Sequence, residues 1–287
     1  MSKIAILGGR GMLGTDLAKL AKSAGLDVAV FDLPEFNITR PSDIQKAVSS
    51  ADIIVNCAAY THVDKAETEK DLCRDVNAIA VGALGKAVRK QGKYLIHLST
   101  DFVFGDKSSK KLNESDPPNP LSWYGSTKLE GEDLLKASKC RHATVRVEWT
   151  YGRTGVNFIT KLLDAAAKFP KLKVVGDQVG SPTWTVDVSR ALLCLAAKQA
   201  EGLYHFSADG YVNRFEVAKF ILDSKNLKKE LSSCLSSDYP TPAKRPSNSR
   251  FDCSKIDKIL DFKRPAWHES MAKYLKGVSS PDFDLTL

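Results

Sequence analysis

Several familiar patterns are missing from this chain of 287 residues. It has no apolar run near the roughly 18–20 residues that a membrane-spanning helix needs, and its first apolar stretch, residues 4–7, is too short for a signal peptide. Its six cysteines form no Cys-x-x-Cys pair, and its five histidines form no His-x-x-x-His pair. We therefore expect no membrane insertion, no secretion, no disulfide scaffold and no metal site, and we place the protein in a reducing cytoplasm.

Concentrated basic charge is missing as well. Lysine and arginine outnumber aspartate and glutamate by 42 to 34, which gives a net charge of +8 and would permit a nucleic-acid partner. The basic residues are scattered among acids, however, and no helix-turn-helix or aromatic RNA-binding signature is present. Walker A loops and Gly-x-Ser-x-Gly elbows are also absent, which argues against kinase and hydrolase chemistry. An anionic small molecule fits the charge equally well, and we predict no nucleic-acid partner.

The chain does contain a regular alternation of strand and helix patterns. Short β-branched runs predict strands at residues 4–7, 28–32, 53–57, 94–98 and 143–149. Between the first two, apolar residues recur at the spacing of one helix face, at positions 17, 20, 21 and 24. This alternation predicts an α/β fold with a doubly wound parallel sheet, the Rossmann arrangement, covered by helices on both faces.

The regular alternation of strand and helix patterns changes near residue 150. We predict one domain in residues 1–150 and a smaller C-terminal lobe made mainly of residues 151–287. A helical pattern at 186–199 resembles the helices of the first domain, so the chain is expected to return there near residues 183–200. The second lobe would then be built from discontinuous pieces.

A glycine-rich loop follows the first predicted strand. Its sequence is Gly8-Gly-Arg-Gly11-Met-Leu-Gly14, and it precedes a helix expected to open at Thr15, which is the context that a dinucleotide fingerprint requires. Glycines there allow a sharp turn, close approach of the backbone to a pyrophosphate and tight packing of helix on strand. The helix N-terminus offers N–H donors to phosphates. A glycine-rich turn without a ligand is the alternative, but the context favours an NAD(P)-binding domain in residues 1–150.

Two charged residues make opposite predictions about the cofactor. Asp32, about twenty residues beyond the glycines, can accept hydrogen bonds from the adenosine ribose and would favour NADH, although an aspartate before Leu33-Pro34 can also simply start a turn. Arg10 can pair with the 2′-phosphate of NADPH. Because both side chains are expected near water, where such pairs contribute about 1 kcal/mol, we predict that NADPH and NADH are both used.

A tyrosine and a lysine one helical turn apart are candidates for catalysis. Of the eight tyrosines, only Tyr124 has a lysine, Lys128, four positions later, so the two side chains share a helix face. The ammonium should lower the pKa of the phenol and help it to move a proton at neutral pH. Ser99 and Thr100 end the preceding strand, where a hydroxyl can reach a substrate carbonyl. The alternatives are a chance surface pair and a capping Ser/Thr.

Together these motifs resemble the extended short-chain dehydrogenases/reductases, and specifically the dTDP-4-dehydrorhamnose reductase family. The similarity runs nearly end to end. It is carried by residues 56–67 (Asn-Cys-Ala-Ala-Tyr-Thr-His-Val-Asp-Lys-Ala-Glu), 97–104 (His-Leu-Ser-Thr-Asp-Phe-Val-Phe), 124–132, 177–183, 202–205 and 239–250 (Tyr-Pro-Thr-Pro-Ala-Lys-Arg-Pro-Ser-Asn-Ser-Arg).

The resemblance implies an NAD(P)H-dependent oxidoreductase, with a nucleotide-sugar lobe, that reduces the 4-keto group of dTDP-6-deoxy-L-lyxo-4-hexulose. By position it implies catalytic roles for Thr100, Tyr124 and Lys128. The implied cofactor contacts, beside Tyr124 and Lys128, are Gly8, Arg10, Gly11, Met12, Leu13, Gly14, Asp32, Ala58, Ala59, Tyr60 and Ser99. The implied substrate contacts are Thr100, Asp101, Phe102, Trp149, Arg245, Asn248 and Arg250.

Some positions bear on the sugar, the diphosphate and the metal. Phe102 stands where the family commonly has tyrosine, and Glu148 where it commonly has a small hydroxyl residue, so the exact sugar stays open. The loop 244–250 carries three cations beside stiffening prolines and suits a diphosphate, with a merely solvated loop as the alternative. Some members bind Mg²⁺ at a dimer interface; Asp16 takes one ligand position and the others are unmatched, so no metal is predicted.

Other functions stay open at this point. A nucleotide-sugar 4,6-dehydratase should carry an acid pair directly after the threonine, whereas Asp101 is followed here by Phe102. The regulatory β subunit of methionine adenosyltransferase resembles the same family and acts as a binding partner, so the fold and cofactor site do not by themselves prove turnover. A related reductase with another sugar substrate is a further alternative. A homodimer is the assembly that we consider, although the sequence does not fix it.

Overall fold

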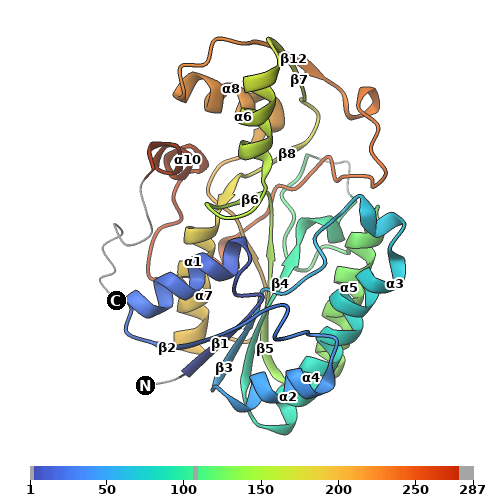
Figure 1. The fold of residues 1–287 in the computed structure, drawn as a ribbon, viewed down its shortest axis with the longest axis vertical. Helices are drawn as coiled ribbons and strands as arrows, with labels where there is room; N and C mark the ends of the chain where they lie inside the picture. The colour runs from blue at the N-terminus through green and yellow to red at the C-terminus, as the bar shows by residue number, and fades with distance from the viewer. Residues whose placement is uncertain (1–2, 106–108, 278–287) are drawn as a thin grey trace.

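A parallel sheet forms the centre of the molecule. The computed structural model describes residues 3–105 and 109–277, so the last ten residues of the predicted C-terminal lobe lie outside the described part. The sheet has six strands in the order β10-β5-β4-β3-β1-β2 (Figure 1). They are β1 (Lys3–Leu7), β2 (Asp27–Phe31), β3 (Ile53–Asn56), β4 (Tyr94–Thr100), β5 (Arg141–Val147) and β10 (Gly202–Phe206). The five predicted strands are confirmed, whereas β10 was not predicted.

Helices cover both faces of the sheet, as predicted. One face is covered by α1 (Met12–Ser23) and α7 (Thr185–Lys198), and the other by α2 (Pro41–Ser49), α4 (Ala80–Lys90) and α5 (Trp123–Ala137). Helix α7 is the predicted helix that returns to the first layer. Helix α1 begins at Met12 and not at the predicted Thr15.

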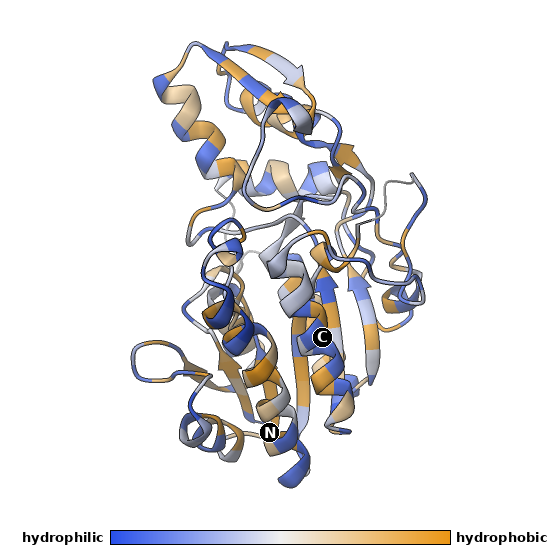
Figure 2. Ribbon diagram, turned by 90° about the vertical axis from the view of Figure 1, so that its right-hand side faces the viewer, coloured by the Kyte–Doolittle hydropathy of each residue, from blue (hydrophilic) through white to orange (hydrophobic). Residues whose placement is uncertain are grey.

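Much of the remaining chain forms a smaller lobe, which lies at the top of Figure 1. It contains α6 (Phe158–Lys168), α8 (Arg214–Ser224) and three short strand pairs, namely β6 (Thr150–Tyr151) with β9 (Thr183–Trp184), β7 (Lys171–Val175) with β12 (Glu230–Cys234), and β8 (Val179–Gly180) with β11 (Val212–Asn213). Together with α10 (Trp267–Lys276), these elements share a second core around Trp184, Ile221 and Met271. Figure 2 shows how hydrophobic residues follow much of the central strands, whereas hydrophobic and hydrophilic residues alternate along the elements of the lobe.

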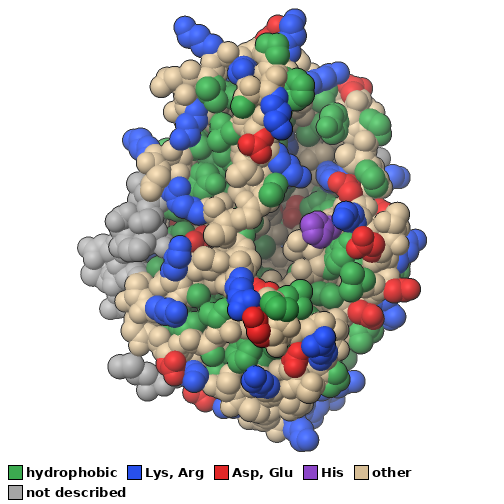
Figure 3. Space-filling model, in the orientation of Figure 1, with side chains coloured by type: hydrophobic (Ala, Val, Ile, Leu, Met, Phe, Trp, Pro, Cys, Tyr) green, Lys and Arg blue, Asp and Glu red, His purple; other side chains and the backbone are tan. Residues whose placement is uncertain are grey.

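The loops that follow the parallel strands gather at the edge of the sheet that faces the smaller lobe. The strand order reverses between β1 and β3, and in open α/β sheets such a reversal opens a crevice for ligands. Figure 3 shows that the surface is hollowed between the two parts of the molecule, with lysine or arginine side chains beside the hollow. None of the helices in residues 3–105 and 109–277 combines the length and the apolar character that a membrane span needs.

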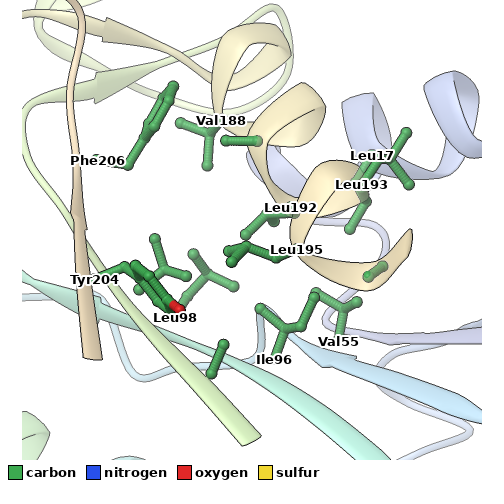
Figure 4. Close-up of a cluster of buried hydrophobic side chains, with 14 of the residues drawn as sticks. Leu17, Val55, Ile96, Leu98, Val188, Leu192, Leu193, Leu195, Tyr204 and Phe206 are labelled. Carbon is green, nitrogen blue, oxygen red and sulfur yellow. The ribbon is translucent and has the colours of Figure 1, made fainter. Parts of the chain in front are cut away.

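The main core explains why these elements form. Alternate residues of the strands face opposite sides of the sheet, so that Ile6 and Ile96 face α1 and α7 whereas Leu7 and Leu95 face α2 and α4. Figure 4 shows leucines of α7, including Leu192, lying over the sheet beside residues of α1. Burial on both faces is the reason that the strands read as continuous hydrophobic runs.

Candidate active site

The glycine loop leaves the beginning of α1 open for a ligand. Gly8 has a φ of +71°, and a Cβ there would lie 2.6 Å from the backbone nitrogen of Ala58, so only glycine fits. A Cβ at Gly14 would lie 2.3 Å from the carbonyl oxygen of Gly8, so this glycine lets α1 pack closely on the loop. Gly11 caps α1 without a side-chain hydrogen bond, and the first turn holds no acidic residue. The helix can therefore offer N–H donors and its positive dipole to phosphate oxygens.

Main-chain donors occupy both oxygens of Asp32. Its Oδ2 accepts a hydrogen bond from the Arg10 amide at 2.8 Å, and its Oδ1 accepts one from the Leu33 amide at 2.8 Å. The Arg10 guanidinium turns toward Glu35, with Nη1 2.8 Å from Oε2, and both side chains are exposed. Asp32 thus holds the glycine loop in place. Because Glu35 pairs with Arg10, it is a third charged side chain that bears on the choice between NADPH and NADH.

Asn77 holds the segment that follows β3. It lies in η2 (Asp75–Ile79), a π-helical turn between α3 (Lys70–Arg74) and α4. Its amide accepts a hydrogen bond from the Tyr60 amide at 2.9 Å and donates one to the Tyr60 carbonyl at 3.1 Å. Sequence reasoning missed Asn77, because its role depends on a contact across the fold. The other predicted cofactor contacts at this edge are partly buried, namely Met12, Leu13, Ala58 and Ala59.

Tyr124 and Thr100 meet at the carboxyl end of β4. Thr100 is the last residue of β4 and is buried. Its hydroxyl donates a hydrogen bond to Asp101 at 3.1 Å and lies close enough to the Tyr124 phenol to lower the pKa of that phenol. A Cβ at Gly125 would lie 2.2 Å from the carbonyl oxygen of Phe102, so glycine lets α5 begin directly against the turn after β4. The Phe102 ring packs edge-on against Tyr124, with centroids 5.4 Å apart. The chain thereby brings two predicted catalytic groups together.

Burial dominates the titration of Tyr124 and Lys128. It raises the pKa of Tyr124, with a smaller effect of the Thr100 hydrogen bond in the opposite direction. It lowers the pKa of Lys128 to about 8, and the Lys128 ammonium donates a hydrogen bond to the Leu98 carbonyl at 2.6 Å. The expectation of a lowered Tyr124 pKa is therefore wrong for this structure, because burial of the phenol is the largest effect on that pKa. Tyr124 keeps its proton at neutral pH.

The side chain of Ser99 faces away from this pair. Neighbouring residues of a strand point to opposite faces, and the Ser99 hydroxyl donates to the carboxylate of Glu132. Glu132 also forms a buried ion pair with Arg146, whose Nη2 lies 2.6 Å from Oε2. Ser99 was predicted as a cofactor contact, and its hydroxyl is committed to this network, so it can meet a cofactor only through its main chain.

Two buried carboxyl groups, those of Asp101 and Glu148, lie in the region of the predicted substrate contacts. Asp101 accepts a hydrogen bond from the Ser249 hydroxyl at 2.6 Å, and Glu148 accepts one from the Ser181 amide at 2.8 Å. Burial raises the pKa of both carboxyls. Trp149 follows Glu148 in a left-handed backbone conformation, with a φ of +46°, which is strained for a bulky residue. Asp101 and Trp149 therefore lie near one another, and their role as substrate contacts stays a prediction.

Arg214 completes this cluster and was missed by sequence reasoning. It opens α8 in the smaller lobe, and its guanidinium carbon lies 3.6 Å from the ring centroid of Trp149. Burial lowers the pKa of Arg214 to about 10, while the charges of Asp101 and Glu148 act in the opposite direction. No motif in the sequence marks Arg214.

The basic loop 239–250 is bound to the large domain by its own side chains. Both guanidinium nitrogens of Arg245 contact the carboxylate of Asp64, at 2.8 and 3.0 Å. Asn248 is buried and donates to the Lys110 carbonyl at 2.9 Å. Arg250 donates to the side-chain oxygen of Asn248 at 2.9 Å. All three of these predicted substrate contacts therefore have hydrogen-bond partners within the protein. The sequence analysis did not identify Asp64 as the partner of Arg245.

Asp16 faces the interior. The Thr185 hydroxyl donates to its carboxylate, and burial raises its pKa. Within the described part of the chain, no three acidic, histidine or cysteine side chains are grouped so that they could hold a metal ion.

Comparison with known proteins places this chain in a family. Residues 2–280 match the model described as the RmlD substrate binding domain. The chain belongs to this family. The dTDP-4-dehydrorhamnose reductase of Aggregatibacter actinomycetemcomitans is 34% identical over 286 residues, which cover 94% of this chain and 97% of that protein. The Escherichia coli protein of the same name is 32% identical and covers 95% of this chain and 96% of its own.

Solved structures agree with this membership in the RmlD substrate binding domain family. A dTDP-4-dehydrorhamnose reductase from Clostridium acetobutylicum is 33% identical, with a TM-score of 0.91 and coverage of 96% of this chain and 98% of that one. One from Bacillus anthracis, solved in complex with NADP, is 31% identical, with a TM-score of 0.92 and coverage of 96% and 99%. The predicted resemblance and the predicted fold are therefore confirmed.

Proposed function

We propose that this protein reduces dTDP-4-dehydrorhamnose to dTDP-L-rhamnose with NADPH or NADH. Relatives that bear the name of this reductase match nearly the whole chain, and one such structure contains NADP. The observation that carries the proposal is the contact between Thr100 and Tyr124 at the carboxyl end of β4, beside Lys128. This constellation suits proton donation to a carbonyl oxygen.

The large domain binds the cofactor in this proposal. The open N-terminus of α1 and the glycine loop suit its diphosphate. Ala58, Ala59 and Tyr60 border the same edge, where Asn77 fixes the segment. A reduced nicotinamide, when bound, supplies the hydride for carbonyl reduction.

Tyr124 and Thr100 act on the oxygen of the carbonyl group. As that oxygen gains negative charge, Thr100 donates a hydrogen bond and Tyr124 transfers its proton. The raised pKa of Tyr124 ensures that the phenol is protonated before the reaction at neutral pH. Lys128, held on the Leu98 carbonyl, places a positive charge below the pair and can hydrogen-bond a ribose.

The smaller lobe binds the nucleotide sugar in this proposal. Asp101 and Phe102 contact the catalytic pair, and loop 239–250 reaches the same region through the Ser249 contact to Asp101. Trp149 lies against Arg214 of the smaller lobe. The six cysteines are all free, which supports a reducing compartment such as the cytoplasm.

The test is to mix the purified protein with NADPH and dTDP-4-dehydrorhamnose and to follow the loss of reduced nicotinamide absorbance. We expect turnover, with NADH also accepted. Tyr124→Phe should lower kcat by about 10²–10⁴, the usual contribution of a general acid, and leave the Kd for NADPH unchanged. Tyr204→Phe is the matched control, because the Tyr204 hydroxyl donates to the Glu201 carbonyl at 3.0 Å just before β10, at the end of the sheet away from Tyr124. It should keep the kcat of wild type.

Two results would contradict this function. Tight NADPH binding without turnover on any 4-keto nucleotide sugar would favour a regulatory binding protein. Near-wild-type kcat in Tyr124→Phe would show that another group gives the proton.

A further inference from the structure

Arg214 has hydrogen-bonding groups that no atom of residues 3–105 and 109–277 satisfies. A guanidinium carries five N–H donors. Across the described residues, none of these donors has an acceptor within hydrogen-bonding distance, and the close contacts of the side chain are the rings of Trp149 and Phe158, at 3.6 and 5.3 Å from the guanidinium carbon. A partly buried cation without acceptors is costly unless a ligand supplies them.

The surroundings fix the position of this cation. Asn213 caps α8 through a hydrogen bond from the Glu216 amide at 2.8 Å, and the Glu216 carboxylate returns a contact to the Asn213 amide, so the backbone at Arg214 is held. The guanidinium stacks on the Trp149 ring. Stacking uses the face of the guanidinium and leaves the donors around its edge free.

The neighbouring carboxyl groups do not use these donors. Asp101 accepts hydrogen bonds from Ser249 and Thr100, and Glu148 accepts one from the Ser181 amide. Arg245, the next cation, is paired with Asp64. Arg214 stays charged at neutral pH, since its pKa is about 10.

We propose that Arg214 binds the diphosphate of the nucleotide sugar through two of its N–H groups. A guanidinium matches two phosphate oxygens, and a cation that is partly removed from water gains more from an anionic acceptor than from a sugar hydroxyl. The inference rests on the proposed function, because it takes a nucleoside diphosphate sugar as the occupant of the hollow. It makes α8 of the smaller lobe part of the substrate site.

The test is equilibrium binding of dTDP, measured by titration calorimetry with NADPH present. Arg214→Met keeps an unbranched side chain that can lie on Trp149 but removes the donors. We expect this variant to raise the Kd for dTDP at least about tenfold, and Arg214→Lys, which keeps the charge but loses the planar fork, to raise it about three- to tenfold. Thymidine, which has no phosphate, should bind the wild type and each Arg214 variant with the same Kd. Lys219→Met removes an exposed cation from the same helix and should leave every Kd unchanged.

The possible outcomes test the role of Arg214 separately from the proposed reductase function. A Kd for dTDP within twofold of wild type in Arg214→Met overturns the role of Arg214. An equal loss for dTDP and thymidine also overturns it, because Arg214 would then only support the shape of the site. An unchanged Kd for NADPH shows that a variant is folded. If Arg214→Met does not fold, the Kd of Arg214→Lys for dTDP tests the role of Arg214 in its place. Absence of NADPH oxidation by the wild type overturns the proposed function but leaves the dTDP measurement valid.

Discussion

At the scale of single residues, cofactor choice depends on three charged side chains near the glycine loop. Asp32 is bound to the amides of Arg10 and Leu33, so its carboxylate supports the loop whichever cofactor is present. Arg10 is held by Glu35 at 2.8 Å. A 2′-phosphate would therefore compete with Glu35 for Arg10, and we expect this competition to keep the preference between the cofactors small.

We predict that Glu35→Gln shifts kcat/KM toward NADPH and Arg10→Ala shifts it toward NADH. Each shift should be about two- to fivefold, because exposed ion pairs contribute little. Asp32→Ala should weaken both cofactors together, since it removes the acceptor that holds the Arg10 amide. The measurement is kcat/KM for NADPH and NADH in each variant.

Asp52→Asn is a control, because it removes an exposed carboxylate that pairs with Lys93 away from the loop. A strong shift toward NADPH in Asp32→Ala would instead show that Asp32 acts by repelling the 2′-phosphate.

Residue roles were predictable where chain order alone fixes the neighbours. Tyr124 and Lys128 are one helical turn apart, and Thr100 ends a strand whose edge binds ligands, so their proximity follows from the fold class. Arg214 and Asp64 could not be found in this way, since each acts through partners far away in the sequence. The pKa of Tyr124 was predicted with the wrong sign, because burial cannot be read from a four-residue spacing.

At the scale of elements, one ion pair fastens loop 239–250 to the large domain. Arg245 uses both nitrogens on Asp64 and also donates to the Thr241 hydroxyl and the Ala243 carbonyl. The loop continues to Ser249, which contacts Asp101. Arg245 therefore affects the substrate site by holding this loop.

We predict that Arg245→Ala and Asp64→Ala each raise the KM for the nucleotide sugar roughly three- to tenfold, and that the double variant does little more than Arg245→Ala, because both single variants break the same ion pair. The Kd for NADPH should stay unchanged. The measurement is a double-mutant cycle on KM. If Asp64→Ala leaves KM unchanged while Arg245→Ala raises it, then Arg245 contacts the substrate directly.

Lys244→Ala is the matched control for this cycle, since Lys244 is an exposed cation in the same loop. It should leave KM close to that of the wild type, and a rise as large as that of Arg245→Ala would indicate a general effect of positive charge.

The large domain was more predictable than the smaller lobe for a physical reason. Strands β1, β3 and β4 and the middle of β5 are buried on both faces, and α1 and α7 carry a clear apolar face, so their patterns appear in the sequence. The strands β6, β8, β9 and β11 contain two residues each, which is too short for any periodicity. Strand β10 follows α7 directly and has no pattern that assigns it to the outer position beside β5.

At the scale of the whole molecule, α7 of the large domain is joined to α10 by a buried aspartate. Asp187, in the first turn of α7, accepts a hydrogen bond from the Ser270 hydroxyl of α10 at 2.6 Å, and its other oxygen has no partner among the described residues. Burial raises the pKa of Asp187 from 3.8 to about 6. Global stability should therefore depend on the protonation of this one group.

The direction of the pH dependence follows from proton binding in the two states. The folded protein holds the Asp187 proton up to about pH 6, whereas the unfolded chain releases it near 3.8, so between these values the folded state binds more protons and stability falls as the pH rises. From pH 5 to pH 8 the contribution of Asp187 to the free energy of unfolding should fall by about 1 kcal/mol. Asp187→Asn cannot titrate, so its free energy of unfolding relative to that of wild type should rise by that amount over the same pH range, whatever constant effect the substitution has.

Urea unfolding at pH 5 and pH 8 measures this change, with Asp223→Asn on the exposed side of α8 as the control. A difference between Asp187→Asn and wild type that is equal at both pH values would mean that Asp187 is already ionised in the folded protein at pH 5.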